Sequence, residues 1–171
     1  EFFNVDEEPI EKKATRIEWD VNAAEKGGYE YFMLKEMYEQ PKAITDTFSP
    51  RIKDGNIVIE ELGMTDEEIQ KVQKIMIVAC GSASHVGCSS KYIFEDLTRI
   101  PVEVDLASEF RYRNPILDEN TMVVVISQSG ETADTLAALR ESKKRGARVL
   151  GVVNVVGSSI AREADNVMYT W

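Results

Sequence analysis

The sequence predicts an α/β protein in which a parallel sheet of about five strands lies between helices on both faces, as a three-layer sandwich. From residue 74 onward, short apolar runs alternate with helical patterns, as in right-handed βαβ units. Most of these runs are apolar almost throughout, which is typical of strands that helices cover on both faces. The 171 residues are 43% apolar and 29% charged, as in a globular domain with its own core.

Residues 1–28 differ from the rest of the chain because they are charged and weakly patterned. Phe2, Phe3 and Val5 are interpreted as part of a strand, and Ile17–Val21 alternates apolar and polar residues as a strand does. The first residue is not methionine, which indicates a piece cut from a longer chain. We therefore expect the tail of a preceding domain followed by a linker.

Residues 29–73 form the expected helical lead-in to the sheet. Apolar residues at helical spacing predict a helix that ends at Pro41, and a second helix that begins just after it. The spacing of Thr65 and Glu68 is that of a capping box, in which two residues satisfy each other's backbone at a helix start. The expected helices span residues 29–40, 42–48 and 65–73, with a turn at 54–56.

Residues 74–171 are expected to form the sheet domain, incomplete at its C-terminal end. A helix should follow the third strand and end near Arg145, because Gly146 permits the left-handed conformation that closes many helices. The other expected helices span residues 85–98 and 158–163. The expected strands span residues 74–80, 102–106, 122–126 and 148–154, and a fifth begins at 166.

The stretch Ser127–Thr135, which follows the third expected strand, combines serines, threonines, a glutamine and a glycine ahead of a helical pattern. The N–H groups of a helix's first turn have no partners within the helix, and the helix dipole adds partial positive charge there. Hydroxyls and N–H groups that converge on such a point form a site for phosphate. The alternative is an ordinary helix start, with Ser129 as the N-cap and Glu131 in the first turn. The hydroxyls exceed what capping requires, which favours an anion site.

The stretch Cys80–Ser84 also leads from an expected strand into a helix. It lacks the further glycines of a dinucleotide-binding turn and the lysine of a phosphate-binding P-loop. An ordinary helix cap made of small residues is the alternative here. In open parallel sheets, ligands bind beyond the carboxyl ends of the strands, where the strand order reverses. We therefore expect a pocket between Gly81–Ser84 and Ser127–Gly130.

Three other residues are candidates for chemistry, and each has a structural interpretation that we favour. His85 is the single histidine and a candidate base, but its place at a helix start predicts a solvated ring. Cys80 is a candidate nucleophile, but its place at a strand end predicts burial. Glu109 is the best-placed acid after a strand, with an ion pair to Arg111 or Arg113 as the alternative. No catalytic residue is predicted.

The net charge is −10 and the basic residues form no cluster, which argues against nucleic acid and an anionic membrane surface as partners. An anionic ligand would therefore depend on local dipoles rather than on the overall field. No apolar run approaches the roughly 18 residues of a membrane helix. The two cysteines form no disulfide framework, which predicts a reducing cytoplasm. We expect no cofactor, and no metal ion because no ligands stand at zinc spacing.

The stretch Ser127–Thr135 resembles the motif of sugar isomerase (SIS) domains. Further motifs of this chain occur, in the same order, in the glutamine–fructose-6-phosphate aminotransferases, which are glucosamine-6-phosphate synthases. The resemblance covers nearly the whole chain from about Tyr29, and the combined motifs are highly specific. These motifs are residues 32–41, 79–81, 107–113, 127–135 and 154–159.

The resemblance implies a flavodoxin-like SIS fold and a part in hexosamine biosynthesis. In that family a glutaminase domain releases ammonia from glutamine, and two SIS domains then convert fructose 6-phosphate and ammonia to glucosamine 6-phosphate. The chain would comprise the linker and most of the first SIS domain, and would lack the catalytic residues. The expected ligands are fructose 6-phosphate, glucosamine 6-phosphate and glucose 6-phosphate, and the expected assembly is a homodimer.

By the same resemblance, side chains of both turns hold the phosphate of the sugar. The family more commonly has threonine and serine where this chain has Ser82 and Ala83, so the first turn offers one hydroxyl fewer. The alternative function is a stand-alone sugar-phosphate-sensing SIS module, but residues 1–70 lack the basic charge and pattern of a DNA-binding helix-turn-helix. The implied substrate-binding residues are Ser82, Ser127, Gln128, Ser129 and Thr132.

Overall fold

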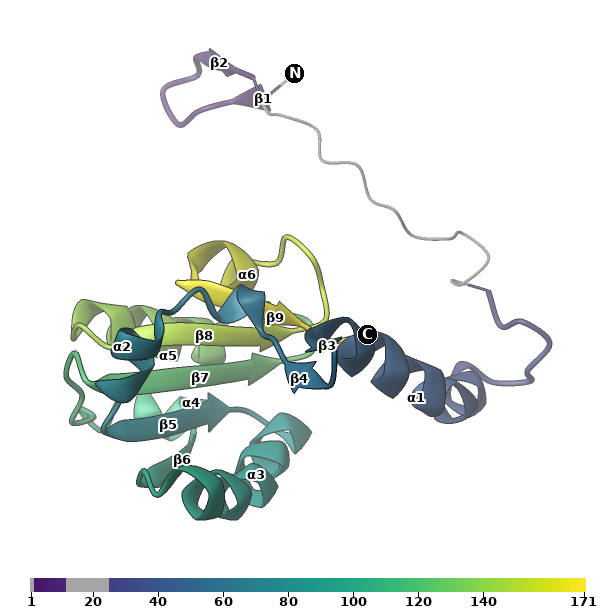
Figure 1. Ribbon diagram of the computed structural model, residues 1–171. Helices are drawn as coiled ribbons and strands as arrows, with labels where there is room; N and C mark the ends of the chain where they lie inside the picture. The colour runs from purple at the N-terminus through teal and green to yellow at the C-terminus, as the bar shows by residue number, and fades with distance from the viewer. Residues whose placement is uncertain (1, 12–24) are drawn as a thin grey trace. The chain divides into compact units, whose positions relative to one another are not determined.

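The computed structural model describes residues 2–11 and 25–171 (Figure 1). The chain divides into two compact units, residues 1–40 and residues 41–171. The alternating pattern expected as a strand at Ile17–Val21 lies outside the described residues. Within the described ranges, no helix is long and apolar enough to cross a lipid bilayer.

The first unit contains a short antiparallel hairpin of β1 (Phe2–Phe3) and β2 (Pro9–Ile10). The side-chain oxygen of Asn4 accepts two backbone N–H groups of the connecting loop, at 2.9 Å each. Val5, which the sequence placed in the strand, lies in this loop instead. The difference has a local cause, because asparagine side chains bond to nearby backbone and so favour a turn.

Helix α1 (Phe32–Phe48) runs through Pro41, so the prediction of two separate helices at this place is wrong. Proline has no N–H and removes one bond from the helical ladder, yet its carbonyl remains an acceptor. That carbonyl accepts the hydroxyl of Thr45 at 2.9 Å. The helix therefore continues with one backbone bond fewer. Within the first unit, the rings of Tyr29 and Tyr38 stack with centroids 5.7 Å apart.

The second unit begins with a short hairpin of β3 (Ile52–Lys53) and β4 (Asn56–Ile57), in the region where the sequence predicted a turn. Asp54 and Gly55 between them have positive φ angles of 51° and 77°. Two consecutive positive φ angles are typical of the tight turn that matches the twist of a hairpin. Two 3-10 helices flank the hairpin, η2 (Ser49–Arg51) and η3 (Glu60–Leu62).

Helix α2 (Asp66–Gln70) starts with the predicted capping box. The N–H of Thr65 donates to the Glu68 carboxylate at 2.8 Å, and the N–H of Glu68 donates to the Thr65 hydroxyl at 3.3 Å. The other carboxylate oxygen of Glu68 accepts from the guanidinium of Arg148 at 3.1 Å, which ties α2 to the sheet. The helix ends before the expected Gln73.

Five parallel strands form the main sheet, in the order β6-β5-β7-β8-β9 (Figure 1). The number of strands, their parallel arrangement and the alternation with helices confirm the predicted fold. From β5 the chain continues to β6 at one edge of the sheet. From β7, on the other side of β5, it continues to β8 and then to β9 at the opposite edge. The strands are β5 (Lys74–Ala79), β6 (Val102–Leu106), β7 (Thr121–Ser127), β8 (Arg148–Val153) and β9 (Asn166–Tyr169).

Four helices connect these strands, and the first begins earlier than expected. Gly81 has φ +56° and ψ −138°, a conformation that turns the chain into the helix directly after the strand. The helix after β7 ends at the predicted glycine, because Gly146 has φ +86°. The helices are α3 (Ser82–Thr98), α4 (Ala107–Phe110), α5 (Ala133–Lys144) and α6 (Ser159–Glu163).

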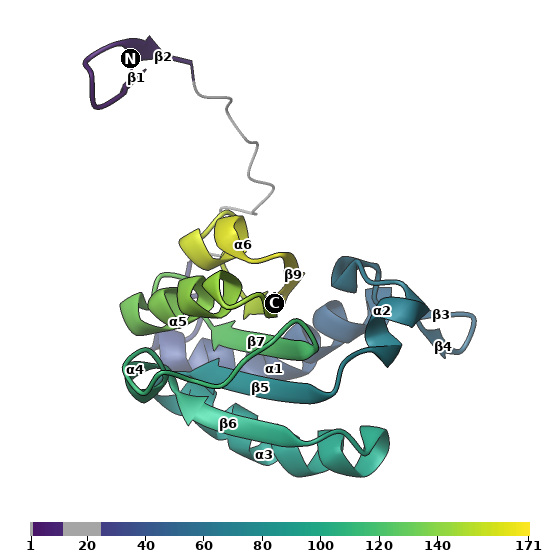
Figure 2. The same cartoon turned by 90° about the vertical axis from the view of Figure 1, so that its left-hand side faces the viewer.

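Helices cover both faces of the sheet and complete the three layers. On one face, Phe110, Leu139 and Ile160 from α4, α5 and α6 are fully buried against the strands. On the other face, α3 packs so closely on β5 and β6 that a Cβ at Gly87 would lie 3.0 Å from Ile77 and from Val104. Figure 2 shows α3 along β6, and α5 and α6 in the opposite part of the view.

Candidate phosphate site at the carboxyl edge of the sheet

The two turns singled out in the sequence lie side by side, at the place where the strand order reverses. Gly81–Ser84, the first turn, follows β5, and Ser127–Thr132, the second turn, follows β7. The chain passes from β5 through α3 to β6 on one side, and from β7 through α5 to β8 on the other. Because β5 and β7 are adjacent and parallel, their carboxyl ends bring both turns to one edge. A cavity of about 300 Å³ lies there, lined by Ser82, Ala83, Val86, Ile126, Ser127, Gln128, Val152, Val153 and Thr170.

Hydroxyl groups brace the second turn from within. Ser127 is buried, with 4% of its surface exposed, and its Oγ accepts the N–H of Gly130 at 3.1 Å. The same Oγ lies 3.0 Å from the hydroxyl of Thr132. The hydroxyl of Ser129 accepts the N–H of Glu131 at 3.2 Å. The turn therefore has a defined shape without any ligand.

Helix α5 begins at this turn without a side-chain cap. Thr132 occupies the N-cap position, but its hydroxyl bonds to Ser127 and makes no capping bond. Ser129, the N-cap in the alternative interpretation, binds the N–H of Glu131 ahead of the helix. The open N–H groups of the helix's first turn leave room for an anion, which the helix dipole favours.

Helix α3 begins at the turn after β5, and it too has no side-chain cap. Its N-cap is Gly81, which has no side chain to offer. The hydroxyl and the N–H of Ser84 both donate back to the carbonyl of Gly81, at 2.7 and 3.1 Å, so the Ser84 side chain caps no N–H group of the helix start. Two long helices thus begin beside the cavity without side-chain caps, and their dipoles add partial positive charge there.

The structure places the predicted binding residues at different depths in this site. Ser82, Ser127 and Gln128 line the cavity, whereas Ser129 and Thr132 lie in the adjoining turn, partly exposed. Gln128 is exposed and its side-chain amide donates to Asn154 at 3.3 Å. Ser127 faces into the turn, so its hydroxyl serves the turn's own bonds.

A third segment, from Asn154 after β8 to Ile160 in α6, bonds to the turn after β7, and sequence reasoning gave it no chemical role. The N–H of Asn154 donates to the carbonyl of Gln128 at 3.2 Å, and the N–H of Ile160 donates to that of Gly130 at 3.0 Å. The side-chain amide of Asn154 also donates to the carbonyl of Thr170 at 2.7 Å. The motif at residues 154–159 was the available signal, but its role depends on contacts across the fold.

The turn after β7 carries a charged group, the carboxylate of Glu131. Glu131 accepts the N–H of Ser159 at 2.7 Å, at the start of α6. Hydrogen bonds from the hydroxyl and the backbone of Ser159 lower the pKa of Glu131, and the charge of Arg162 lowers it further. Glu131 is therefore charged at neutral pH and engaged with α6.

The other candidate residues from the sequence are His85, Cys80 and Glu109. His85 is exposed, and Cys80 is half-buried with its Sγ 3.8 Å from the hydroxyl of Thr135. The arginines considered as partners of Glu109 pair elsewhere, Arg111 with Asp134 at 2.7 Å and Arg113 with Asp105. Across residues 2–11 and 25–171, no cluster of three or more His, Cys, Asp or Glu side chains could hold a metal ion.

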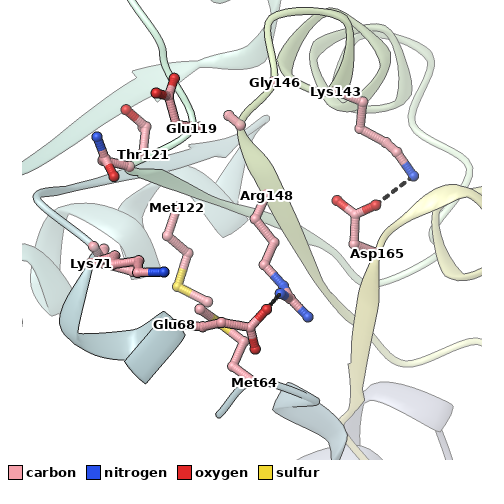
Figure 3. Close-up of a pocket in the computed structure, with 13 residues that line it drawn as sticks. Met64, Glu68, Lys71, Glu119, Thr121, Met122, Lys143, Gly146, Arg148 and Asp165 are labelled. Carbon is pink, nitrogen blue, oxygen red and sulfur yellow. Dashed lines mark hydrogen bonds and ion pairs between the residues drawn. The ribbon is translucent and has the colours of Figure 1, made fainter. Parts of the chain in front are cut away.

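A larger cavity of about 710 Å³ lies at the opposite edge of the sheet, by the amino ends of the strands (Figure 3). Two of its three cations are already paired, Arg148 with Glu68 at 3.1 Å and Lys143 with Asp165 at 2.8 Å, as the dashed lines in Figure 3 show, and the third is Lys71. The end of α5 that borders it is the C-terminal end, which carries partial negative charge. Its chemistry suits an anion less well than the uncapped helix starts do.

The fold and the turn motif correspond to a known domain. The model of the SIS domain family matches residues 68–171, and the chain belongs to this family. The chain is also similar over its whole length to a curated relative from Clostridium acetobutylicum, glutamine–fructose-6-phosphate aminotransferase [isomerizing], with 62% identity. It spans 28% of that relative's length.

Solved structures agree on the architecture. The C-terminal domain of glucosamine-fructose-6-phosphate aminotransferase from Francisella tularensis is 41% identical, with a TM-score of 0.78 over 85% of this chain and 41% of that one. The sugar isomerase domain of an RpiR transcription factor from Sphaerobacter thermophilus is 18% identical, with a TM-score of 0.64 over 81% of this chain and 75% of that one. The second likeness concerns the fold alone.

Proposed function

We propose that the chain is a sugar-phosphate-binding part of an enzyme that makes glucosamine 6-phosphate from fructose 6-phosphate and glutamine. The similarity to a curated aminotransferase, 62% identical along the whole chain, supports this reaction. Within that enzyme the SIS domain would bind the phosphate end of fructose 6-phosphate, glucosamine 6-phosphate or glucose 6-phosphate. A homodimer in the cytoplasm would be the working form.

One observation supports the binding role above all. Two long helices, α3 and α5, start without side-chain caps beside a cavity of about 300 Å³, at the edge where parallel sheets bind ligands. The phosphate would accept N–H groups of the α5 start and the hydroxyls of Ser129 and Thr132. Ser82 and Gln128 would bind from the cavity wall, and Ser127 would fix the turn by its internal bonds.

The proposed organisation follows the resemblance. Residues 1–28 would be the tail of a glutaminase domain and a linker, residues 29–73 a helical lead-in, and residues 74–171 the first SIS domain. The family's ring-opening and isomerising residues belong to other parts of the enzyme. The 171-residue chain alone should therefore neither hydrolyse glutamine nor isomerise sugar phosphates.

A titration of the chain with glucose 6-phosphate, followed by NMR, tests the proposed site. Hydrogen bonds to a charged group contribute roughly 1.5–3 kcal/mol each, so Thr132→Ala should weaken binding about ten-fold or more. Neutral fructose should bind far less than the phosphate ester. The site assignment is wrong if Thr132→Ala binds as tightly as the parent chain, or if fructose binds as well as its phosphate.

A further inference from the structure

The turn proposed to hold phosphate carries a carboxylate of its own. Glu131 stands between Ser129 and Thr132, where a free negative charge would repel an anionic ligand. Its side chain instead accepts the N–H of Ser159 at 2.7 Å, on the side of α6. Hydrogen bonds from Ser159, with the charge of Arg162, keep its pKa low and the carboxylate ionised.

The neighbours of Glu131 are held by the same segment, so the turn and α6 form one packed unit. The N–H of Ile160 donates to the carbonyl of Gly130 at 3.0 Å. A Cβ at Gly130 would lie 2.0 Å from the hydroxyl oxygen of Ser158, which is 3% exposed. A turn so closely packed moves only if its attachment to α6 is released.

We infer that Glu131 is a positioning residue for the phosphate turn. Its bond to Ser159 fixes the turn at Ser127–Thr132 against α6 and directs its own negative charge away from the ligand. The effect on ligand affinity rests on the proposed function, whereas the effect on the shape of the turn does not. Glu131 would act through the backbone of the turn and would not touch the ligand.

The chain offers a matched control at the other end of the same two helices. The carboxylate of Glu163 on α6 accepts two bonds from the guanidinium of Arg140 on α5, at 2.7 and 2.6 Å. The bond from Arg140 is the main cause that lowers the pKa of Glu163. Glu163→Ala therefore removes an ionised carboxylate that links α5 and α6, and leaves the turn intact.

The test is the hydrogen-exchange rate of the Gly130 amide, whose N–H is bonded to the Ser127 hydroxyl. Glu131→Ala should raise this rate about ten-fold, since local opening controls exchange. Glu131→Gln, which keeps an acceptor oxygen, should stay near the parent rate. Ser159→Pro removes the N–H donor at a helix position that tolerates proline, and should act like Glu131→Ala. Glu163→Ala should leave the rate unchanged.

Titration with glucose 6-phosphate separates this inference from the proposed function. Glu131→Ala and Ser159→Pro should bind about ten-fold more weakly than the parent chain, and Glu131→Gln should bind nearly as well. If the parent fails to bind while Gly130 exchange responds as expected, the positioning role stands and the binding function falls. If Glu131→Ala and Ser159→Pro both keep the parent exchange rate, or Glu163→Ala raises it equally, Glu131 does not position the turn.

Discussion

The two turns at the reversal point of the sheet share a location but differ in how they are held. The turn after β7 is bonded internally through Ser127 and externally to the loop before α6. The turn after β5 has one internal side-chain bond, from Ser84 to Gly81, and Ser82 beside it is exposed. One wall of the proposed site is therefore held by more bonds than the other.

The glycines of the two turns should show the largest contrast. Gly81 and Gly130 both have positive φ, 56° and 64°, but a Cβ at Gly81 would meet nothing within 4 Å. Gly81→Ala should cost only the conformational strain, about 1–3 kcal/mol. Gly130→Ala adds a clash with Ser158 and should cost about 4 kcal/mol or more. Urea unfolding of both variants measures the gap, and equal losses would remove the distinction between the turns.

The serines should show the next contrast. Ser127→Ala deletes a buried hydroxyl with two partners and should cost about 1–3 kcal/mol of the free energy of unfolding. Ser82→Ala alters an exposed side chain and should change it by less than about 0.5 kcal/mol. Thermal melting of both variants checks this, and a comparable loss in Ser82→Ala would mean that the first turn is also braced.

Ala83→Ser should show whether the turn after β5 also contacts the ligand. Ala83 lines the cavity, and a hydroxyl there would give the first turn an additional phosphate contact. We expect glucose 6-phosphate to bind up to about ten-fold more tightly, with little change in melting temperature. NMR titration measures the affinity. An unchanged affinity would place the phosphate entirely on the second turn.

Of the two turns, acid should affect the second through Glu131, and this is the smallest expected effect. The pKa of Glu131 is lowered in the folded chain, so its stabilising contribution is complete above the ordinary glutamate pKa. That contribution is lost as the pH falls from about 4.3 through the lowered value. The melting temperature of the parent should therefore fall more steeply than that of Glu131→Gln below about pH 4.3. Parallel melting curves would contradict the role of the charge.

The sequence predicted most of the fold because strand and helix signals are local. The apolar run of β7 and the capping box at Thr65 both depend on residues close together in the chain, and both are confirmed. Pro41 misled the prediction, because a proline signals a helix boundary even where the remaining bonds let the helix continue. The hydroxyl-rich turns were visible as a composition, and their shared edge followed from the parallel sheet.

The attachment of the second turn to α6 was beyond sequence reasoning. Glu131 and Ser159 are 28 positions apart, and nothing in either local pattern indicates that they meet. Ser129 was an attractive helix cap because serine is common there, yet its hydroxyl binds the N–H of Glu131 instead.

The bonds that join the second turn to Asn154 and Ser159 also have a consequence for the order of folding. They close loops of 26 and 28 positions, from Gln128 to Asn154 and from Glu131 to Ser159. Loop closure costs entropy before such contacts form, so the turn should reach its final shape only after β8 has joined the sheet and α6 has docked. A synthetic peptide spanning β7 and α5 would carry every hydroxyl of the second turn and still lack its geometry. On the ribosome, the anion site would mature only once the residues of α6 had left the exit tunnel.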